Sequence, residues 1–448
     1  MTETPDPPTA VGTEPRVQRR WRRDITIFLT GQMVSLFGSM LVQYAIMWHL
    51  ALVTKSGLVL TLSIVFGMLP QAIVSIFGGV WADRMNRKVL IILADSSIAV
   101  STLVLAVVML SGYEELWLIY LTLAIRSFGA GIQQPAVAAL LPQLVPGDQL
   151  LRFNGLFQSA QAGMMLVAPP VAAAVYASMS IIAIFFIDAI TAAIGIALLL
   201  SIAVPTIRAI DTQRGYFTDL VEGVRYTFRH RLVRWVLLLL TIVMLLGAAP
   251  SYLTPLMIVR TFGEDVWLLT VSEVAFAVGM LVAGGVVAAI GPRITRPVVL
   301  AVAMTALFGG LNIALGLSPT IWIFAAFMLL AGAAIPLMST PLTTLLQLRV
   351  EPQLHGRVFG LVGVVMSVAM PVGMVVLGPL SDVVQVETLL IVAGAITFIA
   401  VAAVSLMPAG RGAIRERIDP AEAAALGGDA ILPTMTGPVE VPRPGDTD

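Results

Sequence analysis

The chain contains no cysteine and few charged residues. Of its 448 residues only 12% are Asp, Glu, Lys or Arg, while 58% are hydrophobic and the mean hydropathy is +0.95. The lack of cysteine excludes disulfides, thiol catalysis and cysteine-ligated metal sites. The histidines His49, His230 and His355 lie too far apart in the sequence to indicate a metal cluster. A soluble domain of this length would carry more charge, so we expect most of the chain to lie in lipid.

The sequence also lacks the G-x-x-x-x-G-K-[ST] loop that cradles nucleotide phosphates, which argues against ATP as a direct energy source. It has no intramembrane protease motif and no paired His or Asp ligands, so we do not expect an enzyme. The formal net charge is zero, and we expect no nucleic-acid partner, no metal and no cofactor.

Twelve apolar segments are long enough to span a bilayer, since a spanning helix needs about 20 apolar residues. All but three of the 26 Lys and Arg residues then fall in the tails and in the connections on one side. The exceptions are Lys55 and Arg260 in outer connections and Arg126 inside a span. By the positive-inside rule both termini are expected in the cytoplasm of a multi-pass plasma-membrane protein. The segments are 25–52, 58–81, 88–111, 115–141, 153–178, 181–204, 233–259, 267–291, 297–317, 321–347, 358–380 and 387–407.

A long basic connection after the sixth span divides the chain into two parts of six spans. We expect two six-helix bundles at 25–204 and 233–407, joined by a cytoplasmic loop at 205–232 that carries an amphipathic helix on the membrane surface. The tails at 1–24 and 408–448 are predicted to be disordered and cytoplasmic.

The two parts of the chain resemble each other weakly, as a duplication would. Adding 201 to a position carries Gly131 onto Gly332 and Pro170 onto Pro371 without a gap. Such an internal repeat predicts two bundles related by pseudo-symmetry.

A short charged hairpin, Gly78-Gly79-Val80-Trp81-Ala82-Asp83-Arg84-Met85-Asn86-Arg87-Lys88, joins the second and third spans. Gly78 and Gly79 permit close helix approach, Asp83 can cap or pair, and the bases Arg84, Arg87 and Lys88 mark the cytoplasmic side. We expect Asp95, seven residues further on, to pair with these bases. The second copy of this hairpin keeps glycines and bases but has Ala289 in place of Asp83.

The hairpin resembles the G-x-x-x-D-R-x-x-R-K signature of the major facilitator superfamily of transporters. Other segments resemble the macrolide efflux pumps, a drug-exporter branch of that superfamily: Gly31–Leu36, Ile125–Gly129, Ser272–Met280 and Gly356–Phe359. The resemblance covers residues 25–407. It implies an all-α membrane fold of twelve helices in two pseudo-symmetric bundles, a monomer, and a cavity lined by spans one, four, seven and ten. The glycines of the antiporter motif in span five are largely alanines here, over 163–173.

Four ionisable side chains are expected inside the membrane, where each costs about 2.5–3.5 kcal/mol on insertion scales and so needs a role. Arg126 lies ~16 Å into its span, and the resemblance places it against substrate or a coupling carboxylate; a structural ion pair is the alternative. Glu273 has apolar neighbours, and we assign it to proton coupling together with Arg126 and Asp188. A helix–helix hydrogen bond is the alternative for Glu273. Asp188 and Asp95 could equally serve structure or gating.

Uncharged polar residues at membrane depth predict a binding cavity. Amides and hydroxyls suit a large amphiphilic ligand better than a sugar or an inorganic ion, although each residue alone could instead join two helices. The candidates are Gln32, Gln43, Gln133, Gln158, Gln161, Tyr252, Thr340 and Thr343, together with Arg126.

The sequence therefore predicts a secondary exporter of hydrophobic or amphiphilic, macrolide-like drugs that works by alternating access in exchange for protons. The hairpin of Asp83 is expected to latch the cytoplasmic end of the outward-facing state. An exporter of a siderophore or lysolipid is the alternative of the same mechanism, and a non-transporting receptor is the alternative of a different class.

Overall fold

The computed structural model describes residues 14–146, 149–202, 204, 225, 230–290, 294–350 and 355–415, and the elements within them are helices. Within these residues, twelve spans are long and apolar enough to cross a membrane, as the sequence predicted. Two of the helices, α8 and α9, share one span that bends at Leu253. The helices are α1 (Glu14–Thr54), α2 (Gly57–Arg84), α3 (Arg87–Leu110), α4 (Leu116–Leu144), α5 (Leu150–Ser178), α6 (Ile181–Leu200), α8 (Arg231–Tyr252), α9 (Thr254–Thr261), α10 (Val266–Ile290), α11 (Pro297–Gly316), α12 (Ile321–Arg349), α13 (His355–Leu380), α14 (Val386–Leu406) and α15 (Pro408–Arg415).

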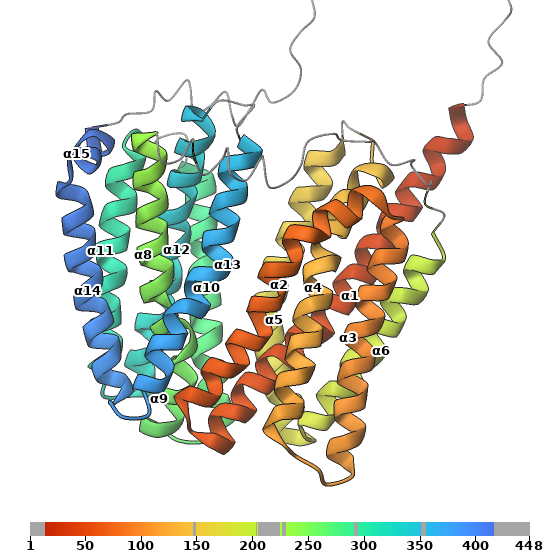
Figure 1. Cartoon of the computed structure of the whole chain (residues 1–448), viewed down its shortest axis with the longest axis horizontal. Helices are drawn as coiled ribbons and strands as arrows, with labels where there is room; N and C mark the ends of the chain where they lie inside the picture. The colour runs from red at the N-terminus through yellow and green to blue at the C-terminus, as the bar shows by residue number, and fades with distance from the viewer. Residues whose placement is uncertain are drawn as a thin grey trace, which may run out of the picture.

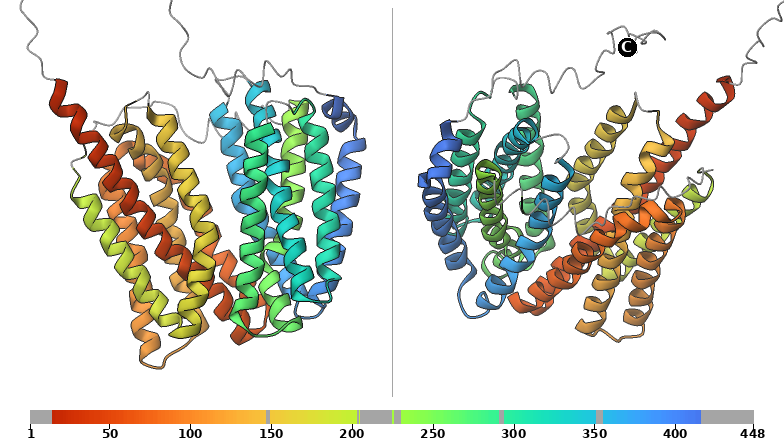
Figure 2. Two further views of the ribbon diagram at one scale, coloured as in Figure 1. Left: turned by 180° about the vertical axis from the view of Figure 1, so that it is seen from behind. Right: turned by 45° about the horizontal axis from the view of Figure 1, so that its top comes forward.

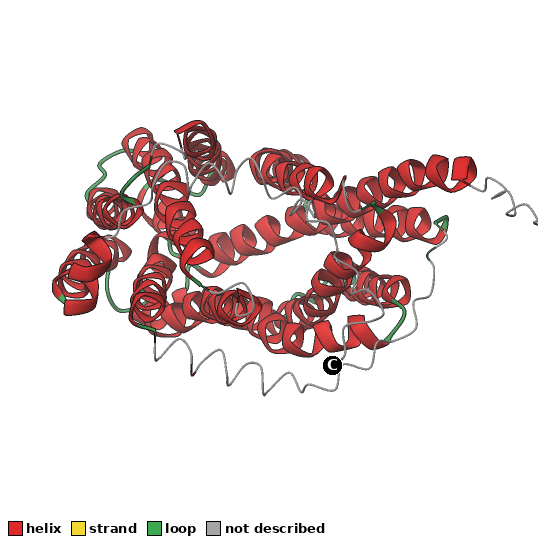
Figure 3. Ribbon diagram, turned by 90° about the horizontal axis from the view of Figure 1, so that it is seen from above, coloured by secondary structure: helices red, strands yellow, loops and turns green. Residues whose placement is uncertain are grey.

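The helices form two groups, an N-terminal bundle of α1 to α6 and a C-terminal bundle of α8 to α15 (Figure 1). The bundles meet at one end, here called the closed end (Figure 2). They diverge toward the other end, here called the terminus end, where α1 begins and α15 ends (Figure 2). Viewed from above, the described elements are helices joined by short connections (Figure 3).

The hydrophobic cores, like the helices, meet at the closed end and are separate at the terminus end. One buried cluster takes in residues of both bundles, including Trp48 of α1 and Phe324 of α12, at the closed end. At the terminus end the cores are separate: Phe28 belongs to a cluster of the N-terminal bundle and Trp235 to a cluster of the C-terminal bundle. Among the described residues, burial of apolar surface in a shared cluster therefore joins the bundles at the closed end.

The glycines of the repeat pack equivalent helix pairs. A Cβ atom on Gly131 of α4 would lie 3.0 Å from the carbonyl oxygen of Gln71 on α2. In the C-terminal bundle a Cβ on Gly332 of α12 would overlap the carbonyl oxygen of Phe276 on α10. Small residues thus allow close backbone contact at corresponding places in the two bundles, as pseudo-symmetry predicts.

Most of the predicted hairpin is helical rather than a turn. Helix α2 continues to Arg84, and the turn is Met85–Asn86, where the side chain of Asn86 accepts hydrogen bonds from the first amides of α3. Gly78 makes the predicted close approach, since a Cβ there would lie 2.5 Å from the carbonyl oxygen of Gly131. The surroundings of Gly79 and the side chains of Asp83 and Arg84 lie outside the described part.

The prediction that both tails are disordered was wrong for the parts next to the membrane, which are helical. Helix α1 begins at Glu14, because extending an existing helix avoids the cost of nucleation. After the last span, Pro408–Arg415 forms α15, whose Gly410 and Ala413 are buried. The predicted amphipathic helix at 205–232 falls almost wholly outside the described residues.

Candidate functional site

A cavity of about 340 Å³ lies in the N-terminal bundle between α1, α4 and α5. Its wall combines side-chain amides with the aromatic rings of Phe28 and Phe157. Four of the amides are predicted cavity residues, which the fold brings together from three helices. The amides are Gln32, Gln133, Gln134, Asn154, Gln158 and Gln161. Sequence reasoning missed Gln134 and Asn154, although both sit among the predicted positions.

A second cavity of about 140 Å³ adjoins the first and reaches Arg126. The two share Gln133 and Gln134, and the smaller one also contains Gln43 and Ser39. The described lining residues of both cavities come from the N-terminal bundle alone.

The remaining predicted cavity residues lie elsewhere. The hydroxyl of Tyr252 on α8 donates to the sulfur of Met68 on α2 at 3.2 Å, so it joins the two bundles. Thr340 and Thr343 of α12 are exposed, and the hydroxyl of Thr343 donates to the carbonyl of Ser339 within its own helix at 2.9 Å. The predicted set is thus divided between a cavity, a bundle contact and an exposed helix face.

Arg126 forms an ion pair with Asp188 of α6, whose side chain is fully buried. The guanidinium also donates to the hydroxyl of Thr102 on α3, and the hydroxyl of Ser39 donates to Asp188 at 3.2 Å. The pair therefore ties α1, α3, α4 and α6 together. A buried charge in lipid needs such a partner, and the structural alternative for Arg126 and Asp188 is realised in this conformation.

Asp95 does not reach the bases of the hairpin, contrary to expectation. Its carboxylate is buried and accepts a hydrogen bond from the side-chain amide of Gln133. Eight residues of helix place it ~12 Å beyond Arg87. The hairpin bases instead donate to backbone carbonyls: Arg87 to Ala139 at 2.8 Å and Lys88 to Ile202 at 2.6 Å.

Glu273 is half-buried, and its helix α10 packs against α5 of the other bundle. Its carboxylate lies within electrostatic reach of the phenol groups of Tyr44 on α1 and Tyr252 on α8. The carboxylate therefore stands where elements of both bundles approach each other.

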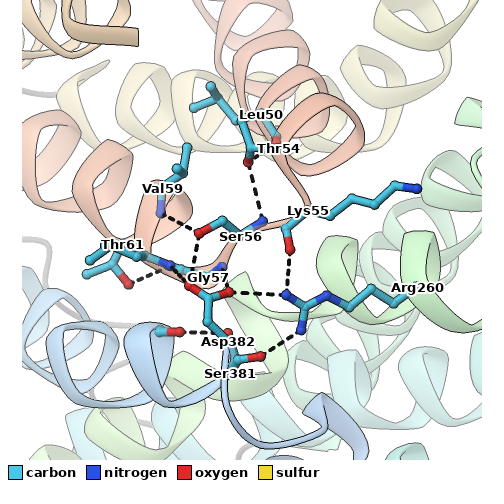
Figure 4. A network of polar contacts seen from close by, with 12 residues as sticks. Leu50, Thr54, Lys55, Ser56, Gly57, Val59, Thr61, Arg260, Ser381 and Asp382 are labelled. Atoms are coloured by element: carbon cyan, nitrogen blue, oxygen red, sulfur yellow. Dashed lines mark hydrogen bonds and ion pairs between the residues drawn. The ribbon is translucent and has the colours of Figure 1, made fainter.

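The closed end is held by a polar network between the bundles (Figure 4). Asp382, in the turn after α13, accepts from the backbone amides of Gly57 at 2.6 Å and Leu58 at 2.9 Å, and from the hydroxyl of Ser56 at 2.9 Å. These groups form the N-terminus of α2, where unsatisfied amides and the helix dipole favour an anion.

Arg260, at the end of α9, completes this network. It donates to Asp382 at 3.1 Å, to the carbonyl of Ser381 at 2.6 Å and to the carbonyl of Lys55. Lys55 in turn pairs with Glu264 across the bundles.

The pKa of Asp382 reflects this setting. Burial alone would raise the pKa, but the hydrogen bonds from Leu58, Gly57, Ser56 and Arg260 outweigh it and hold the pKa below its usual range.

Sequence reasoning did not assign these residues to a site, although a signal was present. Lys55 and Arg260 are the two basic residues that interrupt otherwise base-free outer connections. A basic residue that departs from the positive-inside rule can indicate a contact between helices, because a base on the outer side needs a nearby acid or carbonyl partner.

Comparison with known proteins fixes the family. Residues 25–374 match the family model described as the Major Facilitator Superfamily. The chain belongs to the major facilitator superfamily. It is therefore a multi-pass membrane transporter and not an enzyme, as the sequence predicted.

Relatives within the superfamily are named for drug efflux. The chain is 30% identical over 379 residues to macrolide efflux protein A of Streptococcus pyogenes, covering 84% of this chain and 93% of the relative. It is 31% identical over 324 residues to macrolide efflux protein A of Enterococcus faecalis, covering 71% of this chain and 99% of the relative.

Solved facilitator structures share the fold. The nucleoside transporter NupG superposes with a TM-score of 0.66 at 12% identity, covering 87% of this chain and 100% of that structure. A POT family transporter in complex with a thioalcohol-conjugated peptide superposes with a TM-score of 0.69 at 12% identity, covering 88% of this chain and 97% of that structure.

Proposed function

We propose that this facilitator exports hydrophobic or amphiphilic, macrolide-like drugs by alternating access in exchange for protons, as a monomer with both termini in the cytoplasm. The closed end then faces outward, and the structure represents the inward-facing state. The observation that carries the proposal is the network of Asp382, which joins the bundles at one end while their cores are separate at the other.

The cargo assignment is supported by the wall of the larger cavity. Its amides can bind scattered hydroxyl and carbonyl groups, and Phe28 and Phe157 supply apolar faces. The described lining residues of this cavity carry no charge. A macrolide combines a large apolar ring with such polar groups, and the two relatives are named for macrolide efflux.

The proposed entry of the proton from outside uses Glu273. Its carboxylate is half-buried and lies within electrostatic reach of Tyr44 on α1 and Tyr252 on α8, which belong to different bundles. Rearrangement of the bundles would change its exposure and hence its affinity for a proton. The ion pair of Arg126 and Asp188, which borders the smaller cavity, is the proposed second member of the coupling system.

The hairpin between α2 and α3 is proposed to latch the cytoplasmic end when the transporter faces outward. Its latch residues are Gly78, Gly79, Asp83, Arg84, Arg87 and Lys88. In the present conformation Arg87 and Lys88 donate to carbonyls of their own bundle. Because the latch would act at the opposite end from Asp382, the two contacts would alternate during transport.

The test is transport by the purified protein in proteoliposomes under an imposed pH gradient, with a panel of macrolides, siderophores and lysolipids. We expect macrolide movement that an uncoupler abolishes, and loss of coupled transport in Glu273→Gln and Arg126→Ala. Transport of a siderophore or lysolipid without transport of any macrolide would show that the protein carries that substrate instead of a macrolide. Macrolide movement that is indifferent to the pH gradient would contradict proton exchange.

A further inference from the structure

The side chain of Asp95 is buried with one oxygen lacking a partner in the described structure. It is 2% exposed, and its Oδ1 accepts from Nε2 of Gln133 while Oδ2 makes no hydrogen bond. An ionised carboxylate has about four lone-pair sites, so the amide of Gln133, even with a weaker interaction from Gln32, satisfies it poorly at membrane depth. The group is therefore suited to binding and releasing a proton rather than to holding helices together.

The charged and polar groups around Asp95 come from three helices. Asp188 of α6 acts on it electrostatically, Arg126 of α4 is committed to Asp188, and Gln32 of α1 lies close enough to interact with the carboxyl group. Helix α2 carries no titratable residue from Gly57 to Ala82. Among the described residues no base forms an ion pair with Asp95, because Arg126 is paired with Asp188 instead.

Gln133 connects this carboxyl group to the cavities. Its side chain lines both of them while its Nε2 is held by Asp95. With Nε2 held, the amide oxygen of Gln133 is the group left to accept from a ligand. If Asp95 gains a proton on Oδ2, the carboxyl O–H can donate to that oxygen, and in that arrangement the amide turns and presents its N–H₂ to the cavity.

We propose that Asp95 carries a proton and that the amide of Gln133 transmits its protonation state to the cavity as a change from acceptor to donor. The cavity then binds a ligand that offers a hydroxyl or ammonium donor while Asp95 is ionised, and releases it when Asp95 is protonated. This inference rests on the proposed function, to which it adds a second titrating carboxylate and a ligand class.

The direction of coupling is that of an exchanger. Proton and ligand compete through one amide, and by linkage each lowers the affinity for the other by the same factor. Binding of the ligand from the inner side would require an ionised Asp95. A proton that reaches Asp95 from outside would then cause release of the ligand.

The first test measures equilibrium binding of radiolabelled erythromycin to the purified full-length protein between about pH 5 and about pH 7.5. Wild type should lose about tenfold in affinity toward acid, the equivalent of one charge-assisted hydrogen bond. Asp95→Asn should bind weakly with no dependence on pH. Gln133→Leu should also lose the pH dependence, whereas Gln134→Leu, which alters the neighbouring amide of the same two cavities, should keep it.

A second test does not need the drug. The infrared difference spectrum between acid and neutral pH should contain a protonated-carboxyl band that is absent in Asp95→Asn and present in Gln134→Leu and Glu273→Gln. An unchanged band in Asp95→Asn, or an unchanged pH dependence of binding in that variant, overturns the inference. Loss of the band in Asp95→Asn while wild type fails to bind erythromycin would support the proton site and reject the cargo of the proposed function.

Discussion

The carboxylate of Asp382 accepts a hydrogen bond of 2.6 Å from the backbone amide of Gly57, although 325 residues separate them in the chain. An acid from the C-terminal bundle thus caps a helix of the N-terminal bundle. Because a helix cap stabilises only while the two parts remain in place, this contact can hold the closed end without any covalent or metal link.

Removing the Asp382 carboxylate should loosen the closed end. Since hydrogen bonds to a charged group are worth about 1.5–3 kcal/mol, Asp382→Asn should raise the population that is open at this end about tenfold or more. The chain has no native cysteine, so spin labels can be placed at Val53→Cys and Val383→Cys, two exposed positions on opposite bundles. Their distance distribution should lengthen in Asp382→Asn and stay unchanged in the control Glu114→Gln.

The contribution of Asp382 to the closed end should be insensitive to pH near neutrality. A carboxyl group whose pKa is lowered in the closed state stabilises that state above its open-state pKa, and this contribution is lost as pH falls through the lowered value. The difference in label distance between wild type and Asp382→Asn should therefore stay constant from about pH 8 to about pH 5, and shrink only in stronger acid. Opening near neutral pH that Asp382→Asn abolishes would contradict this.

Single substitutions in the ion pair of Arg126 and Asp188 should cost more than the double one. Removing one partner leaves a buried charge, which costs about 3–5 kcal/mol, whereas Arg126→Gln with Asp188→Asn leaves none. Thermal unfolding in detergent of the wild type, both single variants and the double variant measures the coupling. Additive losses would show that the two side chains act independently.

Glycine substitutions should distinguish close from open helix faces. Gly332→Ala places a methyl group against the carbonyl of Phe276 and should destabilise the protein by about 1–3 kcal/mol. Gly284→Ala, in α10 of the same bundle, meets nothing within 4 Å and should be neutral or slightly stabilising. The melting temperatures of the two purified variants check this; equal losses would contradict the packing.

The N-terminal bundle should contribute more to drug binding than the exposed face of α12. Gln161→Leu removes an amide from the larger cavity and should weaken macrolide binding several-fold to about tenfold. Thr343→Val removes a hydroxyl that already bonds within its own helix and should leave affinity unchanged. Equilibrium binding compares the two, and the reverse order would place the drug on the C-terminal side.

The cavity was partly predictable because its residues recur at helical spacing. Gln158 and Gln161 share one face of α5, and a helix fixes that relation locally. Tyr252 and Thr343 have the same polar character, yet one joins the bundles and the other stays exposed. Polarity at membrane depth therefore identifies candidates, but the rotation of each helix decides which of them share a cavity.

The sequence by itself determined the twelve spans, because an apolar segment in lipid can satisfy its backbone only as a helix. It also determined the places of close packing, since Gly131 and Gly332 follow from the repeat. Only the tertiary structure decided that Arg126 pairs with Asp188, that Asp95 is joined to Gln133, and which end of the bundles is closed. These relations depend on how separate helices are placed against one another, and no local pattern encodes that placement.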